Sequence, residues 1–173
     1  MSIEYRVPGV LDVDQLVNLG RETFVATFGH LYSRDDLDPF LDETFRPAGI
    51  RNELSNPAFR YKLAQDSSQD NLLIAYCKTG PLRVPIATEG NAQEIWQLYV
   101  RSPYHGRGVA QELMHWALSQ CAMQGAQEIY LSVWSGNQRA IRFYERFGFS
   151  HVGSYDYMVG KHADHEFIFR LAL

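Results

Sequence analysis

The sequence predicts an α/β protein of three layers, α/β/α, in which helices cover both faces of a mixed, mostly antiparallel sheet. Two observations predict this fold. Helical patterns come early and strand patterns follow, and a strand–loop–helix–strand–helix–strand series closes the chain. Two neighbouring strands joined through a helix run parallel, so we expect at least one parallel crossover. The chain has 173 residues, 46% of them hydrophobic, and we expect residues 1–173 to form a single domain.

The elements of the first half are predicted from periodicity and from residues that start or stop them. Apolar and polar residues alternate in strands, and apolar residues recur at helical spacing in helices. Asp12 is the expected N-cap of the first helix, Ser33 or Asp35 opens the second, and Pro47 interrupts it. Residues 79–81, Thr-Gly-Pro, are typical of a turn. The expected elements are a strand at 3–7, helices at 12–30, 33–45 and 50–54, and strands at 59–63 and 71–78.

The second half carries the clearer patterns. A tight loop is expected at 101–108, and a helix that follows it should end at Gly125. Asn137 is the natural N-cap of one more helix, and Gly148 is its natural end. The first of these helices is indicated by apolar residues at every fourth position, namely Val109, Leu113, Ala117 and Cys121. Strands are expected at 94–100, 128–134, 149–155 and 166–173.

Composition and charge exclude several classes of protein. Lys and Arg number 16 against 20 Asp and Glu, a net charge of −4, which argues against nucleic acid as a partner and leaves a cationic substrate open. No signal-peptide core or membrane-spanning run is visible, so we expect a cytoplasmic protein without a membrane partner. Cys77 and Cys121 are expected as reduced core thiols. His162, Asp164 and His165 lack a third ligand at a recognised spacing, which favours a hairpin loop and predicts no metal site.

Residues 98–110 join a buried strand to a helix through a loop that contains glycine. Gly106 and Gly108 permit unusual backbone angles or the close approach of a ligand. The helix that follows offers unpaired N–H groups and a partial positive charge, which together form a site for phosphate or pyrophosphate, and Arg107 can add charge. Neither a Walker A loop nor a complete GxGxxG fingerprint is present. An ordinary tight strand-to-helix turn is the alternative.

Residues 137–149 carry a stripe of mostly aromatic side chains on one face of a helix. The spacing of Phe143 and Phe147, with Ala140 beside them, favours core packing. Tyr144 differs in kind, because a buried phenol needs a hydrogen-bond partner and can donate a proton to a leaving thiolate.

These two blocks resemble the GCN5-related N-acetyltransferase (GNAT) superfamily, and the resemblance covers nearly the whole chain. The loop that binds acetyl-CoA in that superfamily has the pattern Q/R-x-x-G-x-G/A, and here it is His105-Gly-Arg-Gly-Val-Ala110, with His in place of Gln or Arg. The second block, N-x-x-A-x-x-F-Y-x-x-x-G-F, matches residues 137–149. More narrowly, residues 23–32, 35–37 and 130–134 resemble the PaiA-type branch, whose members acetylate polyamines.

The resemblance implies a cofactor, a reaction and a set of site residues. Acetyl-CoA would lie where the parallel strands at 94–100 and 128–134 splay apart. Its acetyl group would pass directly to a primary amine of a small molecule, a polyamine being one candidate, without a metal. Tyr144 would protonate the departing thiolate, and Glu94 is the candidate general base, with a solvated strand-end carboxylate as the alternative. The implied cofactor-binding residues are Leu98, Tyr99, Val100, His105, Gly106, Arg107, Gly108, Val109, Ala110, Gln111 and Asn137.

Several alternatives stay open. The chain could acetylate proteins or peptides, or it could be a non-catalytic CoA-binding sensor module, and it is expected as a monomer or a homodimer. The acidic run at 35–43 is either a rim that collects cations or a solvated helix face. Phe24 and Phe28 are four residues apart and are more typical of core than of a substrate wall. Trp96 and Trp134 carry the same ambiguity.

Overall fold

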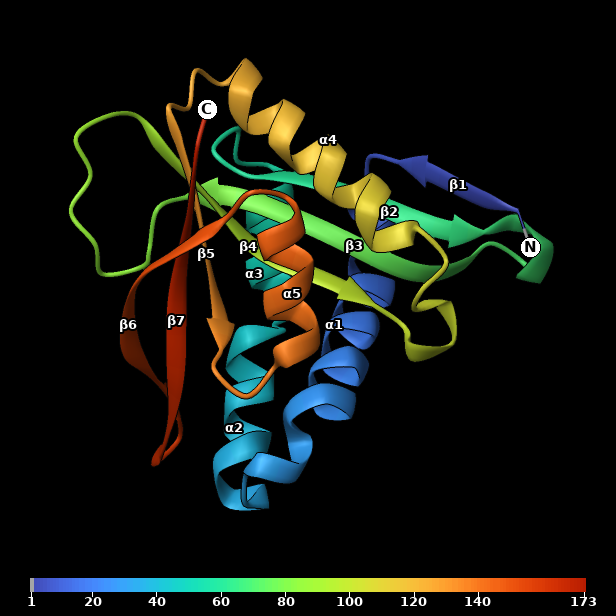
Figure 1. The fold of residues 1–173 in the computed structure, drawn as a ribbon. Helices are drawn as coiled ribbons and strands as arrows, with labels where there is room; N and C mark the ends of the chain where they lie inside the picture. The colour runs from blue at the N-terminus through green and yellow to red at the C-terminus, as the bar shows by residue number, and fades with distance from the viewer. Residues whose placement is uncertain (1) are drawn as a thin grey trace.

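One mixed sheet runs through residues 2–173, the part of the chain that the computed structural model describes (Figure 1). Its strands lie in the order β1-β2-β3-β4-β5-β7-β6, and every neighbouring pair is antiparallel except β4 and β5. The predicted mixed, mostly antiparallel sheet is therefore confirmed. The strands are β1 (Ile3–Arg6), β2 (Arg60–Asp66), β3 (Leu72–Pro81), β4 (Ala92–Val100), β5 (Glu128–Trp134), β6 (Ser150–Val159) and β7 (His162–Ala172).

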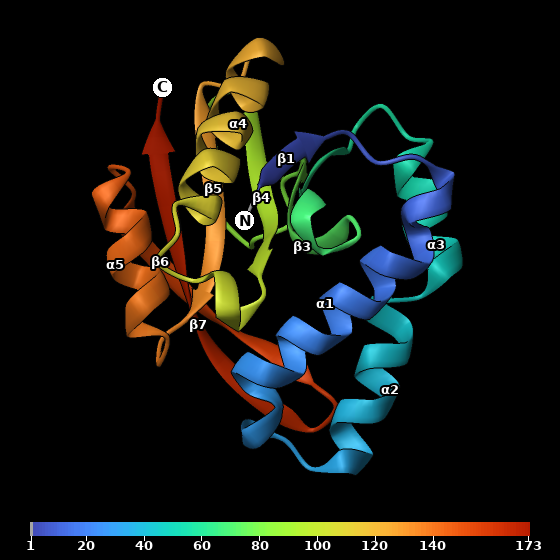
Figure 2. The same ribbon diagram turned by 90° about the vertical axis from the view of Figure 1, so that its right-hand side faces the viewer.

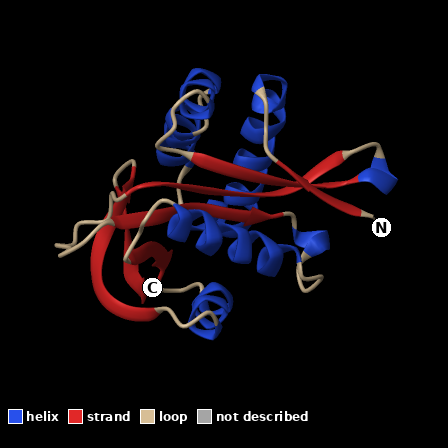
Figure 3. Cartoon of the chain, turned by 90° about the horizontal axis from the view of Figure 1, so that it is seen from above, coloured by secondary structure: helices blue, strands red, loops and turns tan. Residues whose placement is uncertain are grey.

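Helices cover both faces of this sheet (Figures 2 and 3). The helices are α1 (Val13–Phe28), α2 (Arg34–Thr44), α3 (Pro47–Leu54), α4 (Val109–Met123) and α5 (Gln138–Arg146). The first three lie on one face, and α4 and α5 lie together on the other, where the rings of His115 and Phe147 are 5.2 Å apart. A short 3-10 helix, η2 (Gly29–Leu31), connects α1 to α2. Within residues 2–173 no helix is long and apolar enough to span a membrane.

The helix starts show which predicted caps are used. Ser33 Oγ accepts from the N–H of Asp36 at 3.2 Å and so caps α2 as expected. Asp12 occupies the N-cap position of α1 but does not cap that helix with its side chain. Its carboxylate instead binds the Arg6 guanidinium and accepts from the N–H of Gly9 at 2.7 Å. A guanidinium is a stronger partner for a carboxylate than a neutral N–H, which explains the difference.

Two predicted irregular segments are wrong, because both belong to strands. Residues 79–81 continue β3, where Gly80 pairs with Glu94 of β4, and Pro81 is tolerated because it ends the strand. Residues 162–165 open β7 rather than forming a hairpin loop, and the turn that precedes them is confined to residues 160–161. The second correction matters for the site, because it places Asp164 and Glu166 on one face of a strand.

The main core lies between the sheet and α4. The helix contributes the side chains predicted from its fourth-residue spacing, and Leu113, Ala117 and Cys121 are fully buried there. A second cluster packs α1 and α3 against β2 and β3. Cys77 and Cys121 are both free and buried, as predicted, and burial raises the pKa of each thiol. The core thus fixes α4, and with it the loop before α4, against the middle of the sheet.

The sheet divides between β4 and β5. These strands pair only where Ala92–Glu94 lies opposite Glu128–Tyr130, while β4 keeps its pairing with β3 as far as Val100. The register between β3 and β4 shifts by one residue at Trp96, which marks a β-bulge directly after the last pair with β5. A bulge bends its strand and increases the local twist. We attribute the separation of the two strands to this bulge, and the predicted splay is confirmed.

Candidate active site

A cavity of about 530 Å³ occupies the region where β4 and β5 separate. Side chains and backbone from α1, α2, β4, the loop before α4, α4, β5, α5, β6 and β7 line it. Most of the residues predicted for the site meet at this cavity, although they come from three separate segments. Those that line it are Leu98, Tyr99, Val100, His105, Gly106, Gly108, Val109, Ala110, Gln111, Asn137 and Tyr144.

The loop before α4 forms a cradle at one end of the cavity. Gly106 and Gly108 have φ of +73° and +82°, the left-handed region that glycine adopts without strain. A Cβ built on either glycine would meet no atom within 4 Å, so the space beside the loop is open. Gly108 is the N-cap of α4 and supplies no side-chain cap, which leaves first-turn N–H groups of this 15-residue helix for an anion. These features fit a pyrophosphate.

His105 connects this cradle to α5. Its Nε2 lies 2.8 Å from the carbonyl oxygen of Val100, and its Nδ1 lies 2.7 Å from Nη1 of Arg139. A guanidinium only donates, so Nδ1 accepts and Nε2–H donates to Val100. Burial, together with the charge of Arg139, lowers the pKa of His105 below its usual 6.5, which keeps the ring neutral. His105 therefore holds Arg139, which also lines the cavity, beside the cradle.

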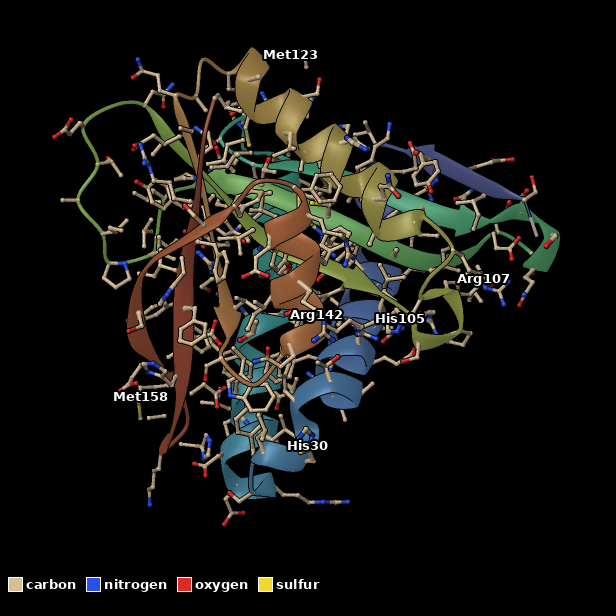
Figure 4. All side chains as sticks on the ribbon, viewed as in Figure 1. His30, His105, Arg107, Met123, Arg142 and Met158 are labelled. Atoms are coloured by element: carbon tan, nitrogen blue, oxygen red, sulfur yellow. The ribbon has the colours of Figure 1, made fainter. Side chains whose placement is uncertain are left out.

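Arg139 is a cavity residue that the sequence patterns did not single out, because it lies between the motif positions of the second block. Arg107 was predicted instead, and the structure places it elsewhere. Its guanidinium lies over the ring of Tyr104 at 5.9 Å, beside a separate hollow that includes Asp66. Figure 4 shows Arg107 on the side of the loop away from α5, whereas His105 lies close to α5. The cation beside the cradle thus comes from α5.

The N-cap of α5, Asn137, and Tyr144 near the C-terminal end of that helix both line the cavity. Asn137 Oδ1 accepts from the N–H of Ala140 at 3.2 Å, the predicted cap, which leaves the amide Nδ2 as its donor. Tyr144 lies two turns further on, half-buried, with its ring 5.5 Å from that of Phe143. Burial raises the pKa of Tyr144, so the phenol keeps its proton at neutral pH.

Glu94 does not line the cavity. Its carboxylate is 1% exposed and accepts from Nε and Nη2 of Arg83 at 3.1 and 2.7 Å. The backbone N–H groups of Arg83 and Val84 donate to its other oxygen at 2.6 and 3.1 Å. These four hydrogen bonds tie down the loop before β4. The placement of Glu94 gives no support to its predicted role as general base, nor to the solvated carboxylate that was the alternative.

The far end of the cavity has aromatic walls. Phe24 and Phe28 of α1 line it, with ring centroids 5.0 Å apart, and Phe24 also packs in the core beneath α2. Phe28 meets Trp134 edge to face at 6.3 Å, and Tyr32 stacks on Phe24 at 6.0 Å. The expectation of core packing alone for the two phenylalanines is therefore incomplete, because both also face the cavity.

Two carboxylates, Asp164 and Glu166 of β7, also line this end. Asp164 is 4% exposed, and the hydroxyl of Tyr32 donates to its Oδ2. Glu166 is half-buried and hydrogen-bonds Ser132 of β5. Neither was singled out as a candidate for catalysis, because Asp164 fell in the predicted hairpin loop and Glu166 opened the strand expected at 166–173. The strand begins earlier, which brings both side chains onto one face.

Two acidic side chains of α2 are bound by residues of neighbouring elements. Asp36 accepts from the N–H of Lys161 at 2.7 Å, and Asp42 pairs with Arg21 at 2.8 Å. None of the acidic side chains at 35–43, all of them described, lines the cavity, which favours the interpretation as a helix face. Within residues 2–173 no group of three His, Cys, Asp or Glu side chains is placed to hold a metal ion.

A sheet divided between two parallel strands, with a glycine cradle at one end of the gap and a phenol beside it, defines an acyltransferase that uses a CoA thioester. The chain belongs to the acetyltransferase (GNAT) family, whose model matches residues 21–149. It is thus an N-acetyltransferase with acetyl-CoA as its acetyl donor.

Individual relatives agree with this assignment. An uncharacterized N-acetyltransferase of Lactobacillus delbrueckii subsp. lactis is 27% identical over 94% of this chain and 92% of its own. A spermidine N(1)-acetyltransferase of Thermoplasma acidophilum is 23% identical over 86% of this chain and 89% of its own. The PaiA N-acetyltransferase of Thermoplasma acidophilum, solved with coenzyme A, has a TM-score of 0.79 at 22% identity over 100% of both chains. Arabidopsis thaliana NAA60, solved with a bisubstrate analogue, has a TM-score of 0.77 at 19% identity over 99% of both. These structures share the fold.

Proposed function

We propose that this enzyme transfers the acetyl group of acetyl-CoA to a primary amine of a small cationic molecule, with a polyamine such as spermidine as acceptor. The observation that carries the proposal is the far end of the cavity, where Asp164 and Glu166 face a space walled by aromatic rings. Carboxylates attract ammonium groups, and aromatic faces add cation–π attraction. The similarity to a spermidine N(1)-acetyltransferase is consistent with this acceptor.

The cradle end of the cavity would hold the cofactor. Backbone N–H groups of Gly106–Ala110 and the Arg139 guanidinium would bind the pyrophosphate, with Gln111 beside them. The end of β4 at 98–100, which does not pair with β5, would form hydrogen bonds with the pantetheine arm of the cofactor. The Asn137 amide would donate to the same arm. Bound acetyl-CoA supplies an activated thioester, and the residues around it position and polarise its carbonyl.

Tyr144 would supply the proton that the departing thiolate needs. It lines the same cavity as the strand end at 98–100, and its phenol is protonated at neutral pH. The amine must lose a proton before it attacks, because with a pKa near 10.4 only roughly one alkylamine in a thousand is neutral at pH 7. The site therefore needs one proton acceptor as well as this proton donor.

A panel of acceptors tests the proposal, with acetylated products identified by mass. The panel contains spermidine, spermine, short diamines, amino acids, aminoglycosides, lysine-containing peptides and peptides with free N-termini. The expected result is preferred acetylation of polyamines. Preferred acetylation of peptides would overturn the acceptor and favour a protein N-acetyltransferase. Bound acetyl-CoA without a product from any acceptor would favour a sensor module.

A further inference from the structure

The proton acceptor of the reaction is the part of the site that the sequence motifs do not supply, and the following inference rests on the function proposed above. Of the acidic side chains in residues 2–173, those that line the cavity are Asp164 and Glu166. Both belong to β7 and, two residues apart, project from the same face of the strand. Glu94 lies outside the cavity, and its carboxylate forms an ion pair with Arg83. The choice of a base thus lies between two carboxylates.

Asp164 has one oxygen that accepts a hydrogen bond and one buried oxygen without a hydrogen-bond partner. Tyr32 donates to its Oδ2, and His162 Nε2 lies 3.2 Å from Oδ1, although that contact lacks the geometry of a hydrogen bond. The carboxylate is 4% exposed, so proton transfer to an incoming amine would require those partners to move. The Asp164 carboxylate is therefore placed to act on Glu166 through its charge.

Glu166 lines the same space and is half-buried. It pairs across the strands with Trp134 of β5 and Tyr155 of β6, and it hydrogen-bonds Ser132, which also accepts from the Tyr155 hydroxyl at 3.2 Å. The negative charge of Glu166 raises the pKa of five tyrosines that line the same cavity. They are Tyr32 near η2, Tyr99 of β4, Tyr144 of α5, and Tyr155 and Tyr157 of β6.

The protonation of Glu166 suits proton transfer near neutral pH. Burial, reinforced by the charge of Asp164, raises its pKa to about 7, and the hydrogen bond from Ser132 opposes this in part. The other charged groups of this region are His162, which faces Asp164, and Arg83, whose charge reaches Tyr99, Tyr155 and Tyr157. A base whose pKa lies near the working pH is efficient, because it is present as the base and still holds a proton well.

We propose that Glu166 is the catalytic base that takes a proton from the acceptor ammonium, and that Asp164, held by Tyr32, is a positioning residue that sets its basicity. The ammonium gives one proton to Glu166, and the amine lone pair forms the C–N bond to the acetyl carbon. The C–S bond breaks with its electron pair on sulfur, which takes the proton of Tyr144. The second N–H proton restores the Tyr144 phenol, and Glu166 releases its proton to solvent. One proton is released per acetyl group transferred.

The first test is the pH dependence of kcat/KM for spermidine. Wild type should rise with pH through an inflection near 7, because Glu166 must be ionised. Glu166→Gln should lower kcat about 100-fold or more and remove this inflection, so that the rate continues to rise toward the pKa of the amine. Glu166→Asp should restore part of kcat. Asp156→Asn is the matched control, because Asp156 is an exposed carboxylate of β6 outside the cavity, and it should match wild type.

Asp164→Asn separates the positioning role from a structural one. The amide still accepts from Tyr32 but lacks the charge, so the inflection should move to lower pH. Unfolding of Glu166→Gln is not expected at pH 8. A carboxyl group whose pKa is raised by folding makes the protein less stable as the pH rises above the pKa that the group has in the unfolded chain. The glutamine amide does not ionise and therefore removes this loss of stability. Retained binding of coenzyme A, measured by calorimetry, checks the fold of each variant.

A titration independent of acetyl transfer completes the test. In protein labelled with ¹³C at the glutamate carboxyl carbons, one resonance should titrate near pH 7 and vanish in Glu166→Gln. Failure of wild type to acetylate any amine while this resonance is present would overturn the proposed function alone. An unchanged pH profile in Glu166→Gln, or loss of the inflection in Glu94→Gln instead, would overturn the assignment of Glu166.

Discussion

At the scale of single residues, the chemistry depends on which groups hold a proton at neutral pH. Burial, and behind it the charge of Glu166, raise the pKa of Tyr144. The phenol is therefore protonated at neutral pH and has a proton to donate when the thiolate leaves the thioester. Tyr144 is therefore suited to act late in the reaction, after the amine has attacked.

Tyr144→Phe should lower kcat by about 100-fold or more while leaving the Kd for acetyl-CoA within about twofold, because only the proton is lost. Steady-state kinetics and calorimetry measure the two effects. Tyr130→Phe is the control: that tyrosine is 2% exposed, donates to Glu128 at 3.1 Å and does not line the cavity. Equal losses in the two variants would contradict a specific role for Tyr144.

We expect His105 to make cofactor binding dependent on pH. Its ring is neutral in the folded protein because burial lowers its pKa, so its contact with Arg139 persists above that pKa and is lost as the pH falls through it. The unfolded chain, in which His105 has its usual pKa of 6.5, binds the proton first, so this contact also contributes stability that declines as the pH falls. The affinity for coenzyme A should therefore weaken on the acid side.

His105→Gln separates this effect from titration of the ligand. A glutamine amide can donate to the Val100 carbonyl and accept from Arg139, as the neutral ring does, but it does not titrate. We expect the variant to bind coenzyme A at pH 7.5 about as well as wild type and to lose less affinity at low pH. Arg139→Gln should weaken binding about 10-fold at pH 7.5 and by less at low pH, where wild type has already lost the contact with His105. Identical pH dependence in His105→Gln and wild type would contradict the account.

Single residues differ in how far the sequence reveals them. Glycines at the cradle were predictable, because few other residues adopt the left-handed backbone that the turn requires. The position of Glu94 outside the cavity has a physical origin: its partner Arg83 lies eleven residues earlier, across a loop with no regular pattern, and only the fold brings the two together. Arg139 was missed for the same reason, since its neighbour His105 is 34 positions away.

At the scale of elements, the N-terminus of α4 is the part of the fold that we expect to bind the cofactor. Gly108→Ala places a Cβ in the open cradle and strains the backbone at φ +82°, whereas Gly125→Ala adds the same strain at φ +74° at the other end of α4. Both should lower the free energy of unfolding by roughly 1–2 kcal/mol.

Only Gly108→Ala should weaken the binding of coenzyme A, by about 10-fold or more, because the added Cβ occupies the space expected for the pyrophosphate. Chemical denaturation and calorimetry on the two variants measure both quantities. Equal affinities would show that the cradle is not where the phosphates bind.

Elements were predictable where periodicity is strong. Helix α4 and strand β5 agree with their expected positions, because four-residue spacing and strand alternation persist through each. The start of β7 was misplaced, because His162 and His165 are exposed polar residues that resemble a loop in composition. Composition describes the outer face of a strand there, while Asp164 and Glu166 face inward into a polar cavity rather than into an apolar core.

At the scale of the whole molecule, the divided sheet creates one cavity with two different ends. The glycine cradle itself comes from one continuous segment, β4 to α4, and could be predicted from the sequence. The acceptor end draws on α1, α2, β5, β6 and β7, and no local motif spans them. The identity of an acceptor therefore depends on long-range packing, which is why the sequence predicts the acetyl donor better than the amine.

A competition experiment tests the central claim most directly. Spermidine and a peptide with a free N-terminus, at equal concentrations, share limiting acetyl-CoA in one reaction, and the ratio of the two acetylated products gives the ratio of their kcat/KM values. The carboxylates and aromatic walls of the cavity predict that acetylated spermidine dominates by about 10-fold or more, which corresponds to about 1.4 kcal/mol. A majority of acetylated peptide would contradict the account.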